Sequence, residues 1–260
     1  ETSLELADAN FTGKPAAAIV EPILSAGGVI VPPKGYLKAL QDACRKRGML
    51  LIVDESQTGL GKTGKLFGFQ HEAGVVPDIV VISKHFGGGL PISAVCATPE
   101  VAEAAVKEGY FATRSHATDP VLCAAGEESL LIVVEEDMAK RARRIERRIR
   151  KAFDEMAAAF ELIGEVRGRG VLLGIELVRD RKTRAPAEKE AARIFEYCLA
   201  NGLIFQLRGV RELKNVIRLV PPMTTTDSQV DRAMSIIRDA IKSALGRGRA
   251  RGRKRKRRRD

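Results

Sequence analysis

The chain has 260 residues, of which 45% are hydrophobic and 30% charged, proportions typical of a soluble globular protein. No apolar run is long enough to span a bilayer and the start does not resemble a signal peptide, so we expect a cytoplasmic protein with no membrane partner. Most of the net charge of +11 lies in residues 246–260, which hold ten Lys or Arg and one Asp and leave about +2 for the rest. Such a run is typical of a disordered tail, and it argues against nucleic-acid binding by any other part of the chain.

Strand-like and helix-like segments alternate along the first half. A helical pattern covers Pro33–Arg47, and Gly48 follows it where a helix-ending glycine is favoured. The predicted strands are Ala16–Leu24, Met49–Val53, Ile79–Ile82 and Ser93–Ala97. Near-continuous apolar strands separated by helices predict an α/β fold whose mostly parallel sheet is sandwiched by helices.

The second half has a different pattern, which predicts a smaller α+β domain. One long helix is expected over Glu135–Phe160, because apolar residues recur on a single face. Further helices are predicted over Ala187–Asn201 and Thr226–Leu245, and strands over Gly170–Val178, Leu203–Leu207 and Val216–Val220. We therefore predict domains at 1–133 and 134–245, followed by the basic tail at 246–260.

Cysteine and histidine usage argues against a zinc site. The four cysteines, at positions 44, 96, 123 and 198, have no metal-ligand spacing, and the three histidines form no paired motif. Buried free thiols in a reducing cytoplasm are the expected state.

Three reactive side chains follow predicted strands: Glu21, Asp54 and Lys84. In an open parallel sheet, ligands bind outside the carboxyl ends of the strands, so we expect these residues near a ligand. Lys84 also precedes the run Gly87–Gly89. A lysine desolvated at such a place becomes a nucleophilic amine, which makes Lys84 a candidate for covalent attachment of a carbonyl compound.

Asp54 and Gln57 sharpen this hypothesis. Pyridoxal 5′-phosphate (PLP) needs a carboxylate beside its ring nitrogen, which keeps that nitrogen protonated and makes the ring an electron sink. It also gains from a donor near its phenolic oxygen. An aspartate at a strand end with an amide three residues later could meet both needs, although a capping aspartate and a surface glutamine would give the same pattern.

Two glycine motifs are predicted to be turns. Gly59–Gly64 matches the G-x-G-x-x-G pattern of dinucleotide sites, but five residues separate it from the strand and no clear helix follows. Arg167–Gly170 lies between a helix and an apolar strand, which favours a tight turn.

Several segments together resemble the class III PLP-dependent aminotransferases. They are EPILSAGGVIVPPKGYL (21–37), VDESQTGLGKTGKLFGF (53–69), PDIVVISKHFGGGLPISAV (77–95), VRGRGVLLGIELV (166–178) and VIRLVPPMT (216–224). The resemblance covers nearly all of the chain except the tail, and it implies the fold of PLP-dependent transferases of fold type I. Within the family, EPILSAGG, HATDP and VRGRGVLLGIELVRDRKT are most similar to 2,2-dialkylglycine decarboxylase.

The resemblance implies a role for six residues. Lys84 would hold PLP covalently and then carry the proton between the substrate Cα and the cofactor C4′. Asp54 would pair with the pyridine nitrogen, and Gln57 would bind the ring 3′-oxygen. Ser115 would reach the phosphate of the partner's PLP in a homodimer. Arg218 would clamp a substrate carboxylate, a task that suits a forked guanidinium, and Asp119 matches a carboxylate that holds an alkali cation in decarboxylase-like members.

Two departures from the family pattern stand out. Ala26 takes the position where members that handle ω-amino groups often carry an acid able to mask the arginine, so Arg218 would stay open to an α-carboxylate. The decarboxylase-like pattern has a small hydroxyl residue there, which leaves decarboxylation undecided. The family's N-terminal part, with its phosphate-cupping turn and its ring-stacking aromatic, is absent, so we expect this chain to hold PLP poorly.

Three functions therefore remain open. The first is transamination from an amino acid or amine to a 2-oxo acid such as pyruvate. The second is decarboxylation-dependent transamination of a 2,2-dialkylglycine. The third is an inactive fragment whose basic tail binds nucleic acid or another polyanion.

Overall fold

The computed structural model describes residues 14–111, 115–209 and 214–256, with side chains described as far as Gly246. The chain divides into two compact units. The first unit comprises Glu1–Ile23 and Val31–Lys140, and the second comprises Arg141–Asp260 together with the early segment Leu24–Ile30. We call Leu24–Ile30 the strap.

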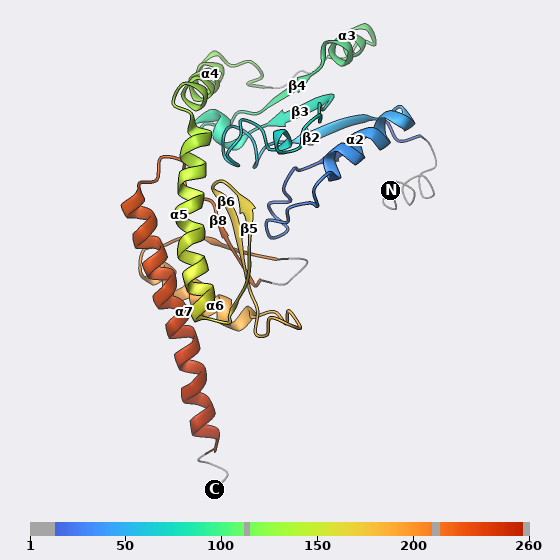
Figure 1. The fold of residues 1–260 in the computed structure, drawn as a ribbon. Coiled ribbons are helices and arrows are strands. Elements are labelled where there is room, and N and C mark those ends of the chain that lie inside the picture. The colour runs from blue at the N-terminus through green and yellow to red at the C-terminus, as the bar shows by residue number, and fades with distance from the viewer. Residues whose placement is uncertain (1–13, 112–114, 210–213, 257–260) are drawn as a thin grey trace. The chain divides into compact units, whose positions relative to one another are not determined.

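The first unit contains a four-stranded sheet in the order β1-β2-β3-β4 (Figure 1). Its strands are β1 (Ala17–Val20), β2 (Leu50–Asp54), β3 (Ile79–Ile82) and β4 (Ala94–Ala97). The first three strands run parallel, and β4 pairs antiparallel with β3. The prediction of a mostly parallel sheet in an α/β fold is confirmed.

Helix α2 (Tyr36–Arg47) corresponds to the helix predicted over Pro33–Arg47. It ends at Gly48, whose φ of 67° is a left-handed conformation that glycine adopts without a steric penalty. Leu37 of α2 packs with Leu51 and Val53 of β2 in a small buried cluster. A second cluster joins Leu60, Ile82 and Phe86 with partly buried residues of α4 (Pro120–Glu135).

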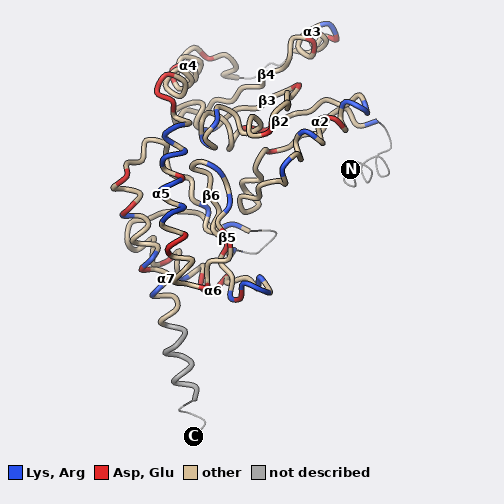
Figure 2. The backbone as a smooth tube through the Cα atoms, in the orientation of Figure 1, with Lys and Arg blue, Asp and Glu red and all other residues tan. Residues whose placement is uncertain are grey.

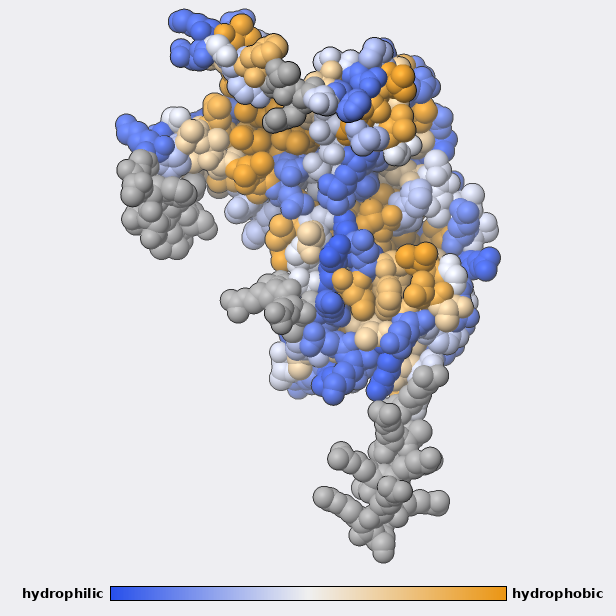
Figure 3. All heavy atoms as spheres, turned by 180° about the vertical axis from the view of Figure 1, so that it is seen from behind, coloured by the Kyte–Doolittle hydropathy of each residue, from blue (hydrophilic) through white to orange (hydrophobic). Residues whose placement is uncertain are grey.

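Helices α3 (Pro99–Lys107) and α4 were not among the predicted elements. Helix α4 is apolar nearly all round, so it has no amphipathic period to reveal it, and Gly126 is its only buried residue. Large exposed apolar side chains of this unit include Val95, Val106, Tyr110, Phe111, Val121 and Val134. Figure 3 shows apolar surface gathered over this part of the chain.

The second unit contains an antiparallel sheet in the order β5-β6-β8-β7. Its strands are β5 (Ile163–Arg169), β6 (Leu172–Leu177), β7 (Gln206–Arg208) and β8 (Val216–Leu219). Helices α5 (Met138–Ala159), α6 (Glu188–Ala200) and α7 (Asp227–Lys256) supply the rest of one large buried core. The turn predicted over Arg167–Gly170 is wrong for most of its length: Arg167–Arg169 are the last residues of β5 and pair with β6, and only Gly170 lies in the turn between the two strands.

The predicted helix over Glu135–Phe160 is present only from Met138 onward. Helix α4 ends at Glu135, and Asp137, whose φ is 44°, interrupts the helical backbone before α5 begins. The apolar stripe expected on this helix is confirmed, because its members are all at most 6% exposed: Met138, Ala142, Ile145, Ile149, Phe153 and Met156. Figure 2 shows basic and acidic residues following one another along α5.

The last helix, α7, continues the backbone into the predicted tail as far as Lys256. Side chains beyond Gly246 lie outside the described residues, so the disordered tail at 246–260 and the predicted domain boundaries stay predictions. All four cysteines are free, but Cys96 and Cys123 are exposed, so the expectation of burial is wrong for these two. Among the described residues, no helix has the length and apolar character needed to cross a membrane.

Candidate active site

The sheet of the first unit brings Asp54 and Lys84 to the same edge. Asp54 is the last residue of β2, and Lys84 follows two residues after β3 ends at Ile82. Because β2 and β3 are parallel neighbours, with Asp54 paired to Val81, their carboxyl ends lie side by side. Glu21 follows β1 at this edge in the same way. The strand-end grouping predicted from the sequence is therefore present.

Lys84 has an unusual backbone. Its φ of 57° lies in the left-handed region that residues with a Cβ rarely adopt. Lys84 is exposed, so the desolvated setting expected from the sequence is not found. It opens the short 3₁₀ turn η2 (Lys84–Gly87), in which Phe86 is only 7% exposed. Strain of this kind persists where surrounding contacts hold it and often marks a functional position.

Asp54 and Gln57 lie half-buried in the loop that follows β2. One carboxylate oxygen of Asp54, Oδ1, accepts a hydrogen bond from the Ser56 N–H at 2.9 Å. The Gln57 side chain makes no hydrogen bond within the part of the chain that the structure describes. Both side chains therefore keep polar atoms that can bind a ligand at this edge.

The rest of this loop, up to Phe69, is rich in turns, as predicted for the glycine motif. Gly61 and Gly64 have φ values of 85° and 90°, which suit glycine. The next helical element along the chain is the 3₁₀ turn η1 (Gly68–His71), which begins four residues after Gly64. A dinucleotide-binding interpretation is not supported, because that motif requires a helix to begin at its last glycine.

Arg218 belongs to the second unit and lies on β8. Residues alternate along this strand: Ile217 and Leu219 enter the helix-covered core, while Arg218 faces away from it. The Arg218 side chain is 8% exposed. Its Nη2 donates to the Ser25 hydroxyl at 2.7 Å and its Nη1 donates to Oε1 of Gln206 at 2.7 Å.

The strap is fastened to the β5–β6 side of the second unit, next to Arg218. Arg167 Nε donates to the Gly28 carbonyl at 3.0 Å, and Arg167 also pairs with Glu176. Val29 of the strap is fully buried against Gly174, where an added Cβ would lie 2.9 Å from the Val29 Cβ. The strap thus carries Ser25 to Arg218 as part of the same compact unit.

Ser115 and Asp119 lie near the start of α4. Ser115 is exposed in a turn. Asp119 is the N-cap of α4: its Oδ1 accepts from the Val121 N–H at 3.3 Å, and its Oδ2 lies 3.4 Å from Nδ1 of His116. Within the described ranges no group of three or more His, Cys, Asp or Glu could hold a metal ion. The proposed alkali-cation role of Asp119 stays a prediction.

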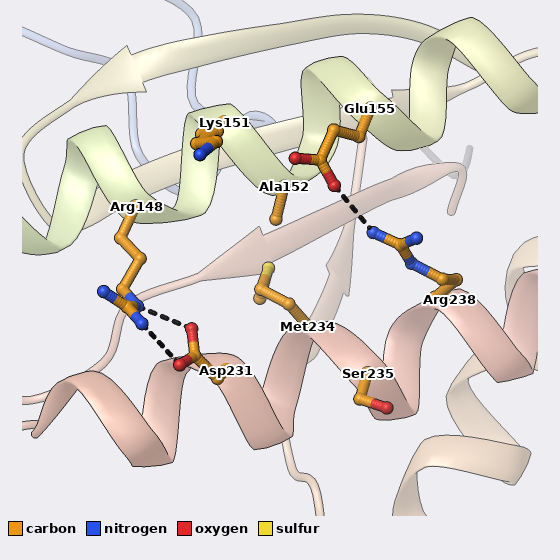
Figure 4. A pocket seen from close by; sticks show the side chains of 8 residues that line it. All are labelled: Arg148, Lys151, Ala152, Glu155, Asp231, Met234, Ser235 and Arg238. Carbon is orange, nitrogen blue, oxygen red and sulfur yellow. Dashed lines mark hydrogen bonds and ion pairs between the residues drawn. The ribbon is translucent and has the colours of Figure 1, made fainter.

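A separate cavity of about 480 Å³ lies between α5 and α7 (Figure 4). Two ion pairs cross it, Arg148 with Asp231 and Arg238 with Glu155. It is lined by Arg148, Lys151, Ala152, Glu155, Asp231, Met234, Ser235 and Arg238. None of these residues was predicted to be functional, and four of the five charged side chains pair with one another across the two helices.

Sequence reasoning did not single out the residues that contact the predicted ones. Ser25 and Gln206 hold Arg218, and Glu55 and His85 bind the loop between Asp54 and Phe69. Glu55 and His85 each follow a predicted site residue directly, which is the one signal that could have drawn attention to them. Ser25 and Gln206 carry no such signal, because their contacts with Arg218 are long-range.

Known proteins that are similar to this chain in sequence and in structure include several aminotransferases. An uncharacterised aminotransferase of Schizosaccharomyces pombe is 37% identical over 239 residues, which cover 92% of this chain and 53% of that protein. A solved aminotransferase of Bacillus anthracis superposes with a TM-score of 0.83 at 31% identity, covering 88% of this chain and 52% of the other. The ornithine aminotransferase of Toxoplasma gondii, described with partial PLP occupancy at its active site, gives 0.77 at 33% identity, covering 89% and 51%.

The chain therefore spans about half the length of the proteins that it matches. The sequence profile described as Aminotransferase class-III matches residues 2–241, which is nearly all of the chain before the basic tail. Members of this family depend on PLP. By this match, and by the fold that it shares with solved aminotransferases, the chain belongs to the class III aminotransferase family.

Proposed function

We propose that this chain forms the lysine-bearing part of a PLP-dependent transaminase, which moves an amino group from an amino acid or amine to a 2-oxo acid such as pyruvate. The observation that carries the proposal is that Asp54 and Lys84 both lie at the carboxyl ends of neighbouring parallel strands, β2 and β3. The left-handed backbone of Lys84 supports it, because such strain is retained where a side chain must be aimed.

The donor set at this edge fits the cofactor chemically. Lys84 offers an exposed amine and Gln57 offers an amide. Asp54 offers a carboxylate, whose Oδ1 accepts from the Ser56 N–H and whose second oxygen is the one proposed to face the ligand. When bound, PLP supplies an electron sink that stabilises negative charge at the substrate carbon. The pairing of an amine with a carboxylate at one strand edge is the combination that this chemistry requires.

Each residue has a defined task in this proposal. Lys84 would hold the cofactor through its Nζ and would move a proton to and from the substrate Cα. The Asp54 carboxylate holds a proton on the ring nitrogen by opposing its positive charge. Gln57 donates to the ring oxygen and orients the ring.

Substrate recognition is assigned to Arg218. Its guanidinium is held by the Ser25 hydroxyl and the Gln206 amide oxygen, which are both neutral groups. A forked guanidinium in a fixed orientation suits a substrate carboxylate. Ala26, next to Ser25 in the strap, adds no acid at the position where ω-amino-acid enzymes often have one, so an α-carboxylate is the preferred ligand.

The remaining assignments concern the assembly. A homodimer is proposed, in which Ser115 of one protomer binds the phosphate of its partner's cofactor, and the exposed turn that holds Ser115 is compatible with this role. Asp119 is proposed to bind an alkali cation in the same assembly. We also propose that the protein is located in the cytoplasm.

The test uses a protein of the relatives' full length that contains this chain. A set of amino donors is screened against pyruvate and 2-oxoglutarate, and the transfer of the amino group is measured. We expect turnover with at least one pair and none after Lys84→Ala. Retained turnover in Lys84→Ala would refute the central assignment, whereas Lys107→Ala, at an exposed lysine of α3, serves as the matched control.

Decarboxylation-dependent transamination of a 2,2-dialkylglycine is the second candidate, and it rests on the resemblance of EPILSAGG, HATDP and VRGRGVLLGIELVRDRKT to that group of enzymes. Carbon dioxide release from 2-aminoisobutyrate in the presence of pyruvate separates it from simple transamination. Release at the rate of amino transfer would support decarboxylation, and amino transfer from other donors without release would exclude it.

A polyanion-binding fragment is the third candidate. Counter-ion release makes such binding fall steeply with salt. A DNA affinity that weakens with salt and disappears when residues 246–260 are deleted would support it. An affinity unchanged by that deletion would remove the tail from the explanation.

A further inference from the structure

The loop from Asp54 to Phe69 is held together from inside by Glu55, which has no role in the proposed chemistry. Its side chain is 1% exposed. Oε2 accepts from the Gly68 N–H at 2.9 Å and from the Thr58 hydroxyl at 2.5 Å, and Oε1 accepts from the Phe69 N–H at 2.8 Å. The carboxylate therefore ties the beginning of the loop, next to Asp54, to its end.

The loop is also packed closely around this carboxylate. A Cβ added at Gly59 would lie 3.0 Å from the Cβ of Glu55, and one added at Gly68 would lie 2.9 Å from the Cβ of Thr58. Thr58 is itself fully buried. Since Gln57 lies between Glu55 and Thr58 in the chain, its backbone is anchored on both sides.

His85 ties this loop to Lys84. Its Nε2 lies 2.9 Å from the Gly59 carbonyl oxygen. A carbonyl only accepts, so Nε2 carries the proton and Nδ1 does not. Burial, with the charges of Lys62 and Lys84 adding to it, lowers the pKa of His85 to about 4, so the ring stays neutral at physiological pH. The residue that follows Lys84 is therefore fixed to the loop that contains Asp54 and Gln57.

We propose that Glu55 and His85 are positioning residues, which hold Asp54, Gln57 and the strained backbone of Lys84 in one fixed arrangement. The inference rests on the proposed function for the roles of the three residues that are positioned. A left-handed backbone at a non-glycine residue persists only where its surroundings hold it. The His85 hydrogen bond and the burial of Phe86 provide such contacts directly after Lys84.

Amide hydrogen exchange on this chain, without cofactor, tests the arrangement directly. Replacing His85 by Leu removes the donor while keeping a side chain of similar size. We expect exchange to become about tenfold faster in residues 55–69 and in residues 83–88 together, because loss of a buried hydrogen bond lowers the free energy of local opening. Exchange within about twofold of wild type in both segments would overturn the proposal.

Two further variants separate positioning from general stability. His85→Gln places an amide nitrogen where Nε2 lies and should restore slow exchange, whereas His85→Asn is too short to reach Gly59 and should not. Gln41→Leu is the matched control, because Gln41 is 1% exposed and binds backbone at Gly74 and Val76, away from the loop. If His85→Leu fails to fold, the exchange rates of His85→Gln and His85→Asn are compared instead. Equal exchange in those two variants would refute the positioning role of His85.

A second readout connects the arrangement to Lys84. PLP and cyanoborohydride are added to each variant, and the labelling rate of Lys84 relative to Lys107 is read by peptide mapping. In wild type we expect Lys84 to be labelled faster than Lys107, and this preference should fall several-fold in His85→Leu and Glu55→Gln and return in His85→Gln. Equal labelling of both lysines in wild type would count against the proposed function, while the exchange data would still judge the positioning role by themselves.

Discussion

Arg218 Nη2 donates to the hydroxyl oxygen of Ser25, 2.7 Å away, although 193 positions separate the two residues in the sequence. The bond fixes one branch of the guanidinium, and Gln206 fixes the other from β7. Two neutral side chains from different parts of the second unit therefore contribute to the orientation of the proposed carboxylate clamp.

Replacing Gln206 by Glu should mask this clamp. The new carboxylate would take the position of an oxygen that now lies 2.7 Å from Arg218 Nη1, and its charge would compete with a substrate carboxylate. In the full-length enzyme we expect KM for carboxylate-bearing donors to rise about tenfold, which corresponds to about 1.4 kcal/mol, with little change in kcat. Amines without a carboxylate should be unaffected. Gln206→Met, which adds no charge, is the control, and an equal rise in KM for both donor classes would contradict the prediction.

The Lys84→Gly variant of the protein should be more stable than the Lys84→Ala variant. Its φ of 57° costs a residue with a Cβ about 1–2 kcal/mol, and only glycine avoids this cost. The greater entropy of glycine in the unfolded chain offsets part of this gain. We therefore expect the free energy of unfolding of Lys84→Gly to exceed that of Lys84→Ala by about 1 kcal/mol. Denaturant unfolding measures the difference. Lys65, an exposed lysine without a positive φ, should show the opposite order, and the same order at both positions would argue against strain at Lys84.

His85 should make stability depend on pH. Its pKa is lowered to about 4 in the folded protein, chiefly by burial and then by Lys62 and Lys84, against 6.5 for the free group. A lowered pKa means that the unfolded chain binds the proton first, so stability is present above pH 6.5 and is lost as the pH falls through 4. The loss from this group is at most about 3 kcal/mol. Protonation would also put a second N–H at Nδ1, which is buried and has no acceptor among the described residues.

The measurement compares wild type with His85→Gln between pH 7.5 and pH 4. Glutamine keeps the hydrogen bond to Gly59 but does not titrate, so its free energy of unfolding should fall less steeply with decreasing pH. The two curves should converge, or cross, toward pH 4. Parallel curves over the whole range would mean that His85 is not the group that titrates.

Gly174 should not tolerate a side chain. An added Cβ would lie 2.9 Å from the Val29 Cβ and 3.1 Å from the Gly28 carbonyl oxygen, both in the strap. Gly174→Ala should destabilise the protein by about 1–3 kcal/mol and speed amide exchange in residues 24–30. Gly246→Ala in α7 meets nothing within 4 Å, and it should instead stabilise that helix by up to about 1 kcal/mol. Differential scanning calorimetry distinguishes the two signs, and a neutral Gly174→Ala would mean that the strap is not packed there.

Local pattern predicted the elements that carry the proposed chemistry. The strand Ile79–Ile82 has the bounds expected from its apolar run, and the Gly48 helix end follows from glycine's tolerance of a left-handed backbone. Asp54 and Lys84 could be placed together because parallel neighbouring strands end at one edge. These features depend on a few adjacent residues and on the general topology of parallel sheets.

Other features depend on contacts that no local pattern encodes. Helix α4 escaped prediction because its apolar residues lie all round it. Strand β5 was missed because its sequence, Ile163–Arg169, mixes glycine and charge and is completed only by pairing with β6. The hydrogen bond from His85 to Gly59 and the one from Arg218 to Ser25 join segments far apart in the chain, and a single sequence gives no signal for either.

The strap also decides how this protein can be recombined with its relatives. Leu24–Ile30 comes before most of the first unit in the chain, yet it belongs to the second. A chimaera that exchanges only Arg141 onward would place a new Arg218 equivalent against the old Ser25 and a new Gly174 equivalent against the old Val29. Under the proposed role of Arg218, substrate preference should therefore depend on two separate segments, Leu24–Ile30 and the part from Arg141 onward. Only a chimaera that exchanges both segments together should transfer that preference.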